Sequence, residues 1–131
     1  MSKPMASDFE VTSYNDLFGN DDEKKLIDGL NRAKEEIKIL PLSELHERAD
    51  HPFKVRRDTQ MDELVGSIKE IGVMQPGMAR PRKEGGYEVL AGYRRWLGCE
   101  IAGLSEMPFI VGNYDDDTAI RIMIHTNKYR D

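Results

Sequence analysis

Two consecutive arginines, Arg94 and Arg95, lie two and three residues after Gly92, where a helix is expected to begin. The positive end of a helix and its first N–H groups attract anions, and planar guanidinium groups bind phosphate well. The alternative is a solvated basic helix start. Arginine at that end opposes the helix dipole, however, so the sequence favours a phosphate site.

The residues on both sides of these arginines predict the local structure in which they lie. Residues 87–90 are strand-like, and Gly92 can turn the chain and let a ligand approach the backbone closely. Leu97 and Ile101 lie four residues apart, on one face of a helix that Gly103 ends. The arginines are therefore predicted at a strand–glycine–helix junction.

The rest of the chain mixes strand-like and helical stretches. The patterns predict a helix over 21–34, a strand over 36–40, a helix from Asp58 or Thr59 to Gly72, a hairpin over 78–90, a buried strand over 107–111 and a helix that starts at 115–117. This order predicts an α+β domain with a small mixed sheet and flanking helices.

Apolar spacing predicts which side chains are buried. The helix over 58–72 should bury Leu64, Ile68 and Ile71, and the last helix should bury Ile120, Met123 and Ile124. Arg80 and Arg82 share a strand face that we expect in water. The three aspartates at 115–117 suit helix capping better than metal binding.

Composition limits the function classes. The chain has 131 residues, one cysteine and a net charge of -5, and its acidic excess falls within residues 1–50. We expect a cytoplasmic protein without an intramolecular disulfide, signal peptide or membrane span. This charge balance disfavours general duplex-DNA binding but allows one small polyanion.

Six stretches along the chain resemble ParB-type partition proteins. The 92–97 stretch resembles the family's Gly-Glu-Arg-Arg-x-Arg box, and the others are 37–42, 51–53, 64–76 and 102–108, with 126–130 resembling Glu-Asn-x-x-Arg. The likeness covers about Ile37 to Asp131. It implies a ParB/sulfiredoxin-like fold and a site for a CTP-like nucleotide with magnesium.

The resemblance also implies roles for single residues. Gln75 matches a glutamine that orders water for hydrolysis, which would make it catalytic, and Asn127 matches an asparagine that meets metal and phosphates. For Arg56, nucleotide binding and a solvent-facing pair with Arg57 both stay open. The implied nucleotide-binding set is Arg56, Gln75, Gly92, Tyr93, Arg94, Arg95, Asn127 and Arg130.

Four positions depart from the family pattern. Tyr93 and Thr126 stand where the family has glutamates, Leu97 replaces the third arginine, and Tyr129 replaces a glutamine. Thr126 removes a carboxylate suited to magnesium. Whether a weak CTPase activity survives is therefore open, and restoring both glutamates should favour nucleotide binding.

The resemblance also suggests a domain division and partners. We expect a disordered tail over 1–22, a peripheral helix over 23–35 and a ParB-like N-terminal domain over 36–131, with the family's DNA-binding helix-turn-helix domain lying in a longer protein. A ParA-type ATPase would bind the tail, where 14–19 is either a docking motif or inert. The domain would self-associate when nucleotide closes a clamp on DNA.

Two other functions stay open. A ParB-fold enzyme, either a nuclease or a small-molecule kinase, would need carboxylates that we cannot place, and Cys99 lies too far into its helix for sulfiredoxin-like catalysis. An interaction module that has lost nucleotide binding is the other alternative, and Tyr93 and Thr126 favour it.

Overall fold

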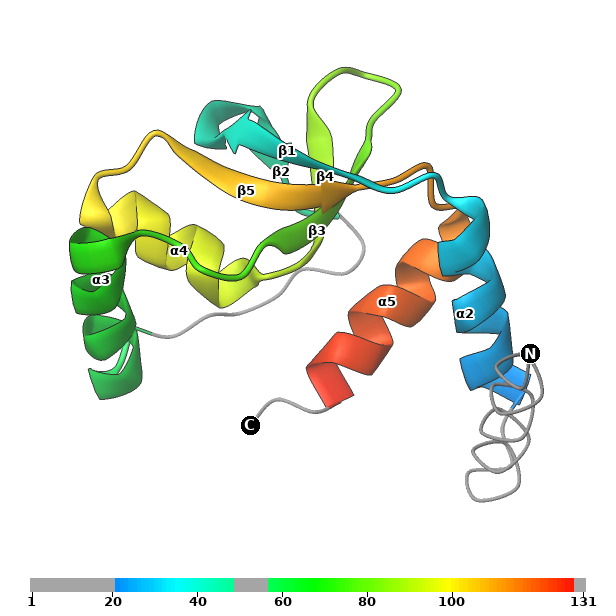
Figure 1. Ribbon diagram of the computed structural model, residues 1–131, viewed down its shortest axis with the longest axis horizontal. Helices are drawn as coiled ribbons and strands as arrows, with labels where there is room; N and C mark the ends of the chain where they lie inside the picture. Colours follow the sequence, from blue (N-terminus) through cyan, green and yellow to red (C-terminus); the bar gives the residue numbers. More distant parts are fainter. Residues whose placement is uncertain (1–20, 49–56, 129–131) are drawn as a thin grey trace, which may run out of the picture.

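A computed structural model describes residues 21–48 and 57–128 as an α+β fold. Five strands form one mixed sheet in the order β1-β5-β3-β4-β2, so β1 and β2 are its edges. Figure 1 shows α3 and α4 below one half of the sheet and α2 and α5 below its other end. The predicted fold class is confirmed.

The elements follow the predicted order closely. They are α2 (Asp21–Arg32), β1 (Glu36–Pro41), the short 3-10 helix η1 (Leu42–Glu44), β2 (Leu45–His46), α3 (Thr59–Ile71), β3 (Gly77–Pro81), β4 (Tyr87–Ala91), α4 (Tyr93–Ala102), β5 (Glu106–Val111) and α5 (Asp116–Lys128). β3 lies antiparallel to β4 and parallel to β5. The parallel pairing explains why the long crossover through β4 and α4 is needed.

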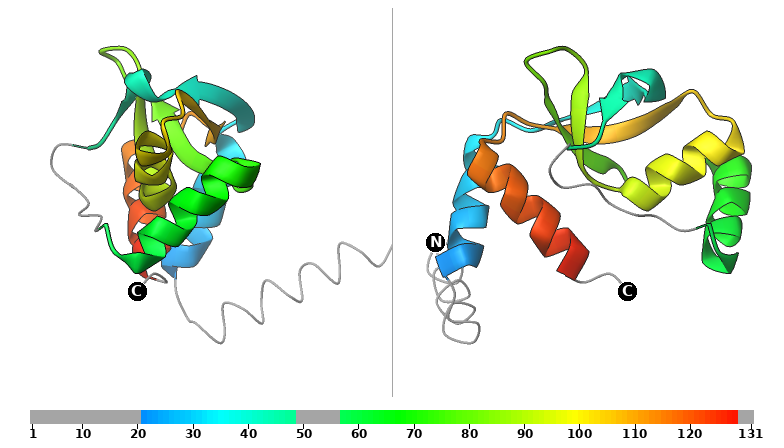
Figure 2. Two further views of the ribbon diagram at one scale, coloured as in Figure 1. Left: turned by 90° about the vertical axis from the view of Figure 1, so that its left-hand side faces the viewer. Right: turned by 180° about the vertical axis from the view of Figure 1, so that it is seen from behind.

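The apolar core forms two clusters instead of one. The larger packs α3 and α4 against the sheet around Phe109, Met107 and Val89, which are fully buried. The smaller joins α2 and α5 to the end of β4 through Leu26, Leu90 and other side chains. Figure 2 shows α2 and α5 side by side, away from α3 and α4.

Two predicted core positions are wrong. Ile71 is 63% exposed and Ile124 is 61% exposed. α3 instead buries Met61 and Val65 beside Ile68. Periodicity locates the apolar stripe of a helix but not its edge, because the position of the neighbouring element decides which end of the stripe is covered.

Arg80 was expected in water, and this prediction is also wrong. Its Nε donates to Glu88 at 2.8 Å, and its Nη1 lies 3.1 Å from the carbonyl oxygen of Tyr114 and 2.9 Å from the Asp116 carboxylate. The side chain is 15% exposed. Arg80 therefore ties the hairpin to the start of α5 in a partly buried ion network.

The aspartates at 115–117 cap α5, as the sequence predicts, and they also form ion pairs. The Asp115 carboxylate accepts the N–H of Thr118 at 2.7 Å, which caps α5 and holds the pKa of Asp115 below its usual value. Asp117 pairs with Arg121 at 2.9 Å. In the described parts of the chain, no three His, Cys, Asp or Glu residues gather as a metal site.

The first helix begins at Asp21, so residues 21 and 22 belong to it and not to the expected tail. It packs on α5, where Gly29 lies against Thr118 so closely that a Cβ would collide with it. The remaining tail, residues 1–20, lies outside the described residues. None of the described helices has the length and apolar content that crossing a bilayer requires.

Two buried tyrosines predict a loss of stability in alkali. Burial is the main cause that raises the pKa of both Tyr93 and Tyr114, and the hydrogen bond from Tyr114 to Glu35 raises its pKa further. The folded protein then keeps these protons after the unfolded chain has lost them, so stability is complete below about pH 10 and falls as pH rises above it. Urea unfolding measured across this range should show a smaller alkaline loss in Tyr93→Phe and in Tyr114→Phe. An unchanged pH dependence in both variants would contradict the assignment.

Candidate functional site

One open cavity, of about 530 Å³, lies between α3, the start of α4 and the end of α5. The loop that joins α3 to β3 forms one wall. The lining residues are Leu64, Ser67, Ile68, Gly72, Val73, Met74, Gln75, Ala91, Gly92, Arg94, Arg95 and Thr126. Four residues that the sequence singled out for nucleotide binding, Gln75, Gly92, Arg94 and Arg95, thus meet at one surface.

Gly92 makes the turn into α4 in a conformation that other residues avoid. Its φ is 95° in the left-handed region, and its carbonyl accepts the N–H of Trp96 at 2.9 Å, the first bond of the helix. A Cβ there would lie 2.9 Å from the Cα of Gly77. Both the backbone angle and this close approach therefore require glycine, and they bring the positive end of α4 to the cavity wall.

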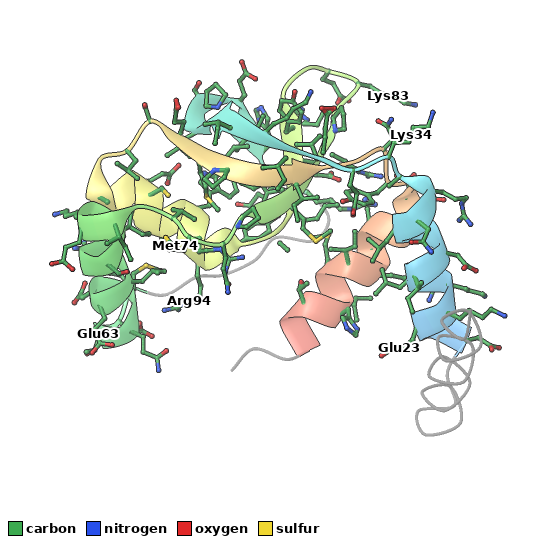
Figure 3. The ribbon with its side chains drawn as sticks, in the orientation of Figure 1. Glu23, Lys34, Glu63, Met74, Lys83 and Arg94 are labelled. Carbon is green, nitrogen blue, oxygen red and sulfur yellow. The ribbon has the colours of Figure 1, made fainter. Side chains whose placement is uncertain are left out.

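The two arginines play different structural parts. Arg95 donates from Nη2 to the carbonyl oxygen of Pro76 at 3.3 Å, which links α4 to the loop over 72–76. Arg94 is 28% exposed, and its Nη2 lies 3.8 Å from a carboxylate oxygen of Asp58, beyond hydrogen-bond distance. Figure 3 shows Arg94 extending away from α4, below the loop that carries Met74. Arg94 is therefore the more available cation.

The electrostatic character of the cavity follows from its lining. Its two charged side chains among the described residues are Arg94 and Arg95, and no described carboxylate lines it. The helix dipole adds to their charge. An apolar part, formed by Leu64, Ile68 and Val73, lies beside the cationic part. The arrangement can bind an anion that carries a flat or apolar group.

Tyr93 lies in the core and its side chain does not line the cavity. The side chain is buried, its hydroxyl donates to the carbonyl oxygen of Val89 at 2.6 Å, and its ring packs on Trp96 with centroids 5.6 Å apart. Burial raises the pKa of Tyr93, so the hydroxyl stays neutral. Whatever Tyr93 offers a ligand can come only through its backbone.

Cys99 is fully buried in the larger core cluster. Burial raises the pKa of its thiol, although Arg95 acts in the opposite direction. A buried neutral thiol is a poor nucleophile. The position agrees with the expectation that Cys99 packs and does not react.

Thr126 brings the end of α5 to the cavity. Its hydroxyl donates back to the carbonyl oxygens of Ile122 at 2.9 Å and Met123 at 3.3 Å. Asn127 belongs to the last turn of α5, but its side chain lies outside the described residues, as do Arg56 and Arg130 entirely. The structure therefore gives no geometry for these three predicted site residues.

A magnesium ion fits this cavity poorly. The described lining offers hydroxyl oxygens from Ser67 and Thr126 and an amide oxygen from Gln75, but no carboxylate. Magnesium prefers at least one carboxylate together with phosphate oxygens. A bound ion would thus depend on the oxygens of the ligand itself.

Ser67 and Met74 are cavity residues that the sequence reasoning missed. Ser67 carried a usable signal, because it follows Leu64 by three residues and so shares the helix face of the apolar stripe. Met74 lies in a loop, where spacing carries no such signal.

Comparisons with known proteins agree on one family. Residues 28–128 match the ParB N-terminal domain family. The chromosome-partitioning protein ParB of Caulobacter vibrioides is 36% identical over 92 residues, covering 69% of this chain and 30% of that protein. A probable ParB of Mycobacterium leprae is 33% identical, covering 97% of this chain and 40% of its own length. The chain therefore spans well under half of these relatives.

Solved structures give the same result. A C-terminally truncated ParB from Caulobacter crescentus in complex with CTP-gamma-S aligns with a TM-score of 0.63 and 34% identity, over 73% of this chain and 54% of that one. A ParB from the same organism in complex with the centromeric parS site aligns with a TM-score of 0.59 and 30% identity, over 69% of this chain and 46% of that one. Sulfiredoxin from Arabidopsis thaliana shares the fold. It aligns with a TM-score of 0.53 and 22% identity, over 67% of this chain and 97% of its own length. The strand–glycine–helix junction, the fold around it and these matches show that the chain belongs to the ParB N-terminal domain family.

Proposed function

We propose that this domain binds a CTP-like nucleotide and thereby controls closure of a DNA clamp in a ParB-like partition protein of a chromosome or plasmid. The observation that carries the proposal is the meeting of Arg94, Arg95 and the glycine-turned start of α4 at one cavity without a described acidic side chain. Such a cavity suits a polyphosphate.

The two parts of the cavity suit the two parts of a nucleotide. Arg94 and the positive end of α4 would take the phosphates, while Leu64, Ile68 and Val73 would cover the base or ribose. Gln75 is exposed beside them and would orient water if hydrolysis occurs. Asn127, Arg56 and Arg130 would complete the site, as the family resemblance implies.

The relatives support the ligand and the DNA partner of this proposal. One ParB structure similar to this chain was solved with CTP-gamma-S and another with parS DNA. For this chain, sequence-specific DNA contacts would come from a helix-turn-helix domain of a longer protein, and a ParA-type ATPase would bind the N-terminal tail. The protein would act in the cytoplasm on the nucleoid or a plasmid.

Arg94→Ala should weaken nucleotide binding by about 10- to 100-fold, because it removes charge-assisted hydrogen bonds to phosphate. Calorimetry with CTP, other nucleoside triphosphates and inorganic triphosphate, with and without magnesium, measures this. Arg121→Ala is the matched control, since the Arg121 side chain is 20% exposed, close to the 28% of Arg94, and lies near an exposed aspartate but outside the cavity. A well-folded domain that binds none of these ligands would refute the proposal.

Hydrolysis is tested separately from binding. Phosphate release from CTP should fall in Gln75→Ala while the affinity changes little, because Gln75 would act on the attacking water. Release that is absent from the unaltered chain, with binding intact, would make the domain a nucleotide-binding switch without CTPase activity.

A second function, an interaction module without nucleotide, is favoured by Thr126. Its hydroxyl is turned back onto the helix backbone, where the family has a carboxylate. Thr126→Glu should strengthen magnesium-dependent nucleotide binding by roughly tenfold, the scale of one charge-assisted contact. Thr126→Gln, which has the same length without the charge, is the control. Equal effects of both variants would contradict a role for the missing carboxylate.

A further inference from the structure

The edge strand β1 presents an apolar face that no other described element covers. Ile37 is 70% exposed and Ile39 is 57% exposed, while Leu40 is the one buried residue of the strand. Their partners on β5, Ile110 and Pro108, lie on the same sheet face. The strand therefore carries adjacent exposed isoleucines on an open edge, which is the usual form of a strand-pairing surface.

The register between β1 and β5 shows which β1 residues form backbone hydrogen bonds to β5 and which point to the open edge. The antiparallel register that pairs Glu36 with Val111 places Leu42 opposite Ser105. There the Leu42 N–H donates to the Ser105 carbonyl at 2.9 Å. Alternate residues of an antiparallel strand bond to the same neighbour. Residues 36, 38 and 40 thus bond to β5, and the backbone groups of Ile37 and Ile39 point to the open edge.

The stretch of β1 that can pair with another strand is limited at both ends. Pro41 also faces outward and has no N–H to donate. Lys34, with φ of 54°, breaks the extended backbone on the other side. A partner strand can therefore pair only with a short stretch centred near Ile37, which restricts the available registers.

We propose that β1 pairs antiparallel with β1 of a second copy of this chain, with the two-fold axis at Ile37. In this register Ile37 lies opposite Ile37 of the second copy, and their outward N–H and C=O groups bond to each other. Glu36 then lies opposite Lys38 of the second copy, and Lys38 lies opposite its Glu36. Both opposite-charge pairs stabilise the contact.

Neighbouring registers are less favourable. A two-fold axis at Lys38 places two lysines opposite each other, which is destabilising. An axis at Ile39 places Ile37 opposite Pro41, where a backbone donor is missing. The charge order of β1 thus selects a second copy in one register. The contact area of one edge is small, so the expected dimer is weak.

Cysteine crosslinking tests this register with a closely matched control. Ile37→Cys places two thiols across the axis with Cα atoms about 5.5 Å apart, within disulfide range. Ile39→Cys is similarly exposed and on the same face, but its two copies would lie about 14 Å apart, four residues of strand rise. Under oxidised glutathione without nucleotide, Ile37→Cys should form disulfide-linked dimers at least about tenfold faster than Ile39→Cys. Cys99 is buried and does not compete.

A charge swap tests the partner independently. Glu36→Lys and Lys38→Glu should each weaken the dimer by about tenfold in sedimentation, because each creates like-charge pairs. The double swap should restore it, which a purely structural role of either residue would not produce. Equal crosslinking at 37 and 39, or failure of the double swap to restore association, would overturn the proposal. Because nucleotide is absent, either result leaves the nucleotide proposal to its own test.

Discussion

Gly92→Ala is expected to destabilise the domain by roughly 2–5 kcal/mol and to remove ligand binding at the cavity. A left-handed φ costs a residue with a Cβ about 1–3 kcal/mol. The Cβ would also lie 2.9 Å from Gly77, which is backbone and cannot move aside like a flexible side chain. Gly77 is itself enclosed, because a Cβ on it would lie 2.7 Å from the ring of Phe109 and 2.7 Å from the carbonyl oxygen of Ala91. Chemical denaturation measures the loss of stability.

Gly66→Ala is the matched control for this experiment. Gly66 lies on the exposed face of α3, and a Cβ there meets nothing within 4 Å. The variant should therefore gain up to about 1 kcal/mol through helix propensity. If Gly92→Ala is as stable as the unaltered chain, the turn is not the constraint that positions α4.

Tyr93→Glu is expected to cost about 4 kcal/mol or more, enough to unfold much of a domain with ordinary stability. The family resemblance alone suggests that glutamate here would improve the nucleotide site. In this structure the side chain is 5% exposed, lies among apolar residues and donates to a backbone carbonyl that a carboxylate cannot satisfy. Restoring the family residue should therefore damage this core before it can help the site.

Tyr93→Phe separates packing from charge. It keeps the ring on Trp96 and loses only the hydrogen bond to Val89, which is worth about 1 kcal/mol. The thermal unfolding temperature of Tyr93→Glu should therefore lie far below that of Tyr93→Phe. A Tyr93→Glu variant that unfolds at the same temperature as Tyr93→Phe would mean that this side chain can leave the core.

Local signals located the junction correctly because its constraints are local. Gly92, the helix that follows it and the stop at Gly103 depend on backbone angles and on spacing within one turn. The Asp58 cap and the Gly72 end of α3 are of the same kind, with Asp58 accepting the Met61 N–H at 2.9 Å. Features of this type follow from neighbouring residues and can be predicted from the sequence.

Arg80 shows what spacing cannot predict. Strand spacing predicted only a solvated polar face, whereas the structure pairs Arg80 with its cross-strand neighbour Glu88 at 2.8 Å. Its contacts with Tyr114 and Asp116 come from residues more than thirty positions later, brought there by the path of β5. Whether a charged side chain is solvated or enclosed depends on elements that are distant in the sequence.

The order of amino acids by itself determined the α+β class, the glycine turn into α4 and the pair of arginines placed there, since backbone preference and apolar period act over a few residues. Only the tertiary structure decided that Gln75 and Thr126 meet those arginines, that Tyr93 faces the core and that Ile71 faces water. These outcomes depend on how two separate apolar clusters position α3, α4 and α5 around one cavity, and packing between distant segments sets that arrangement.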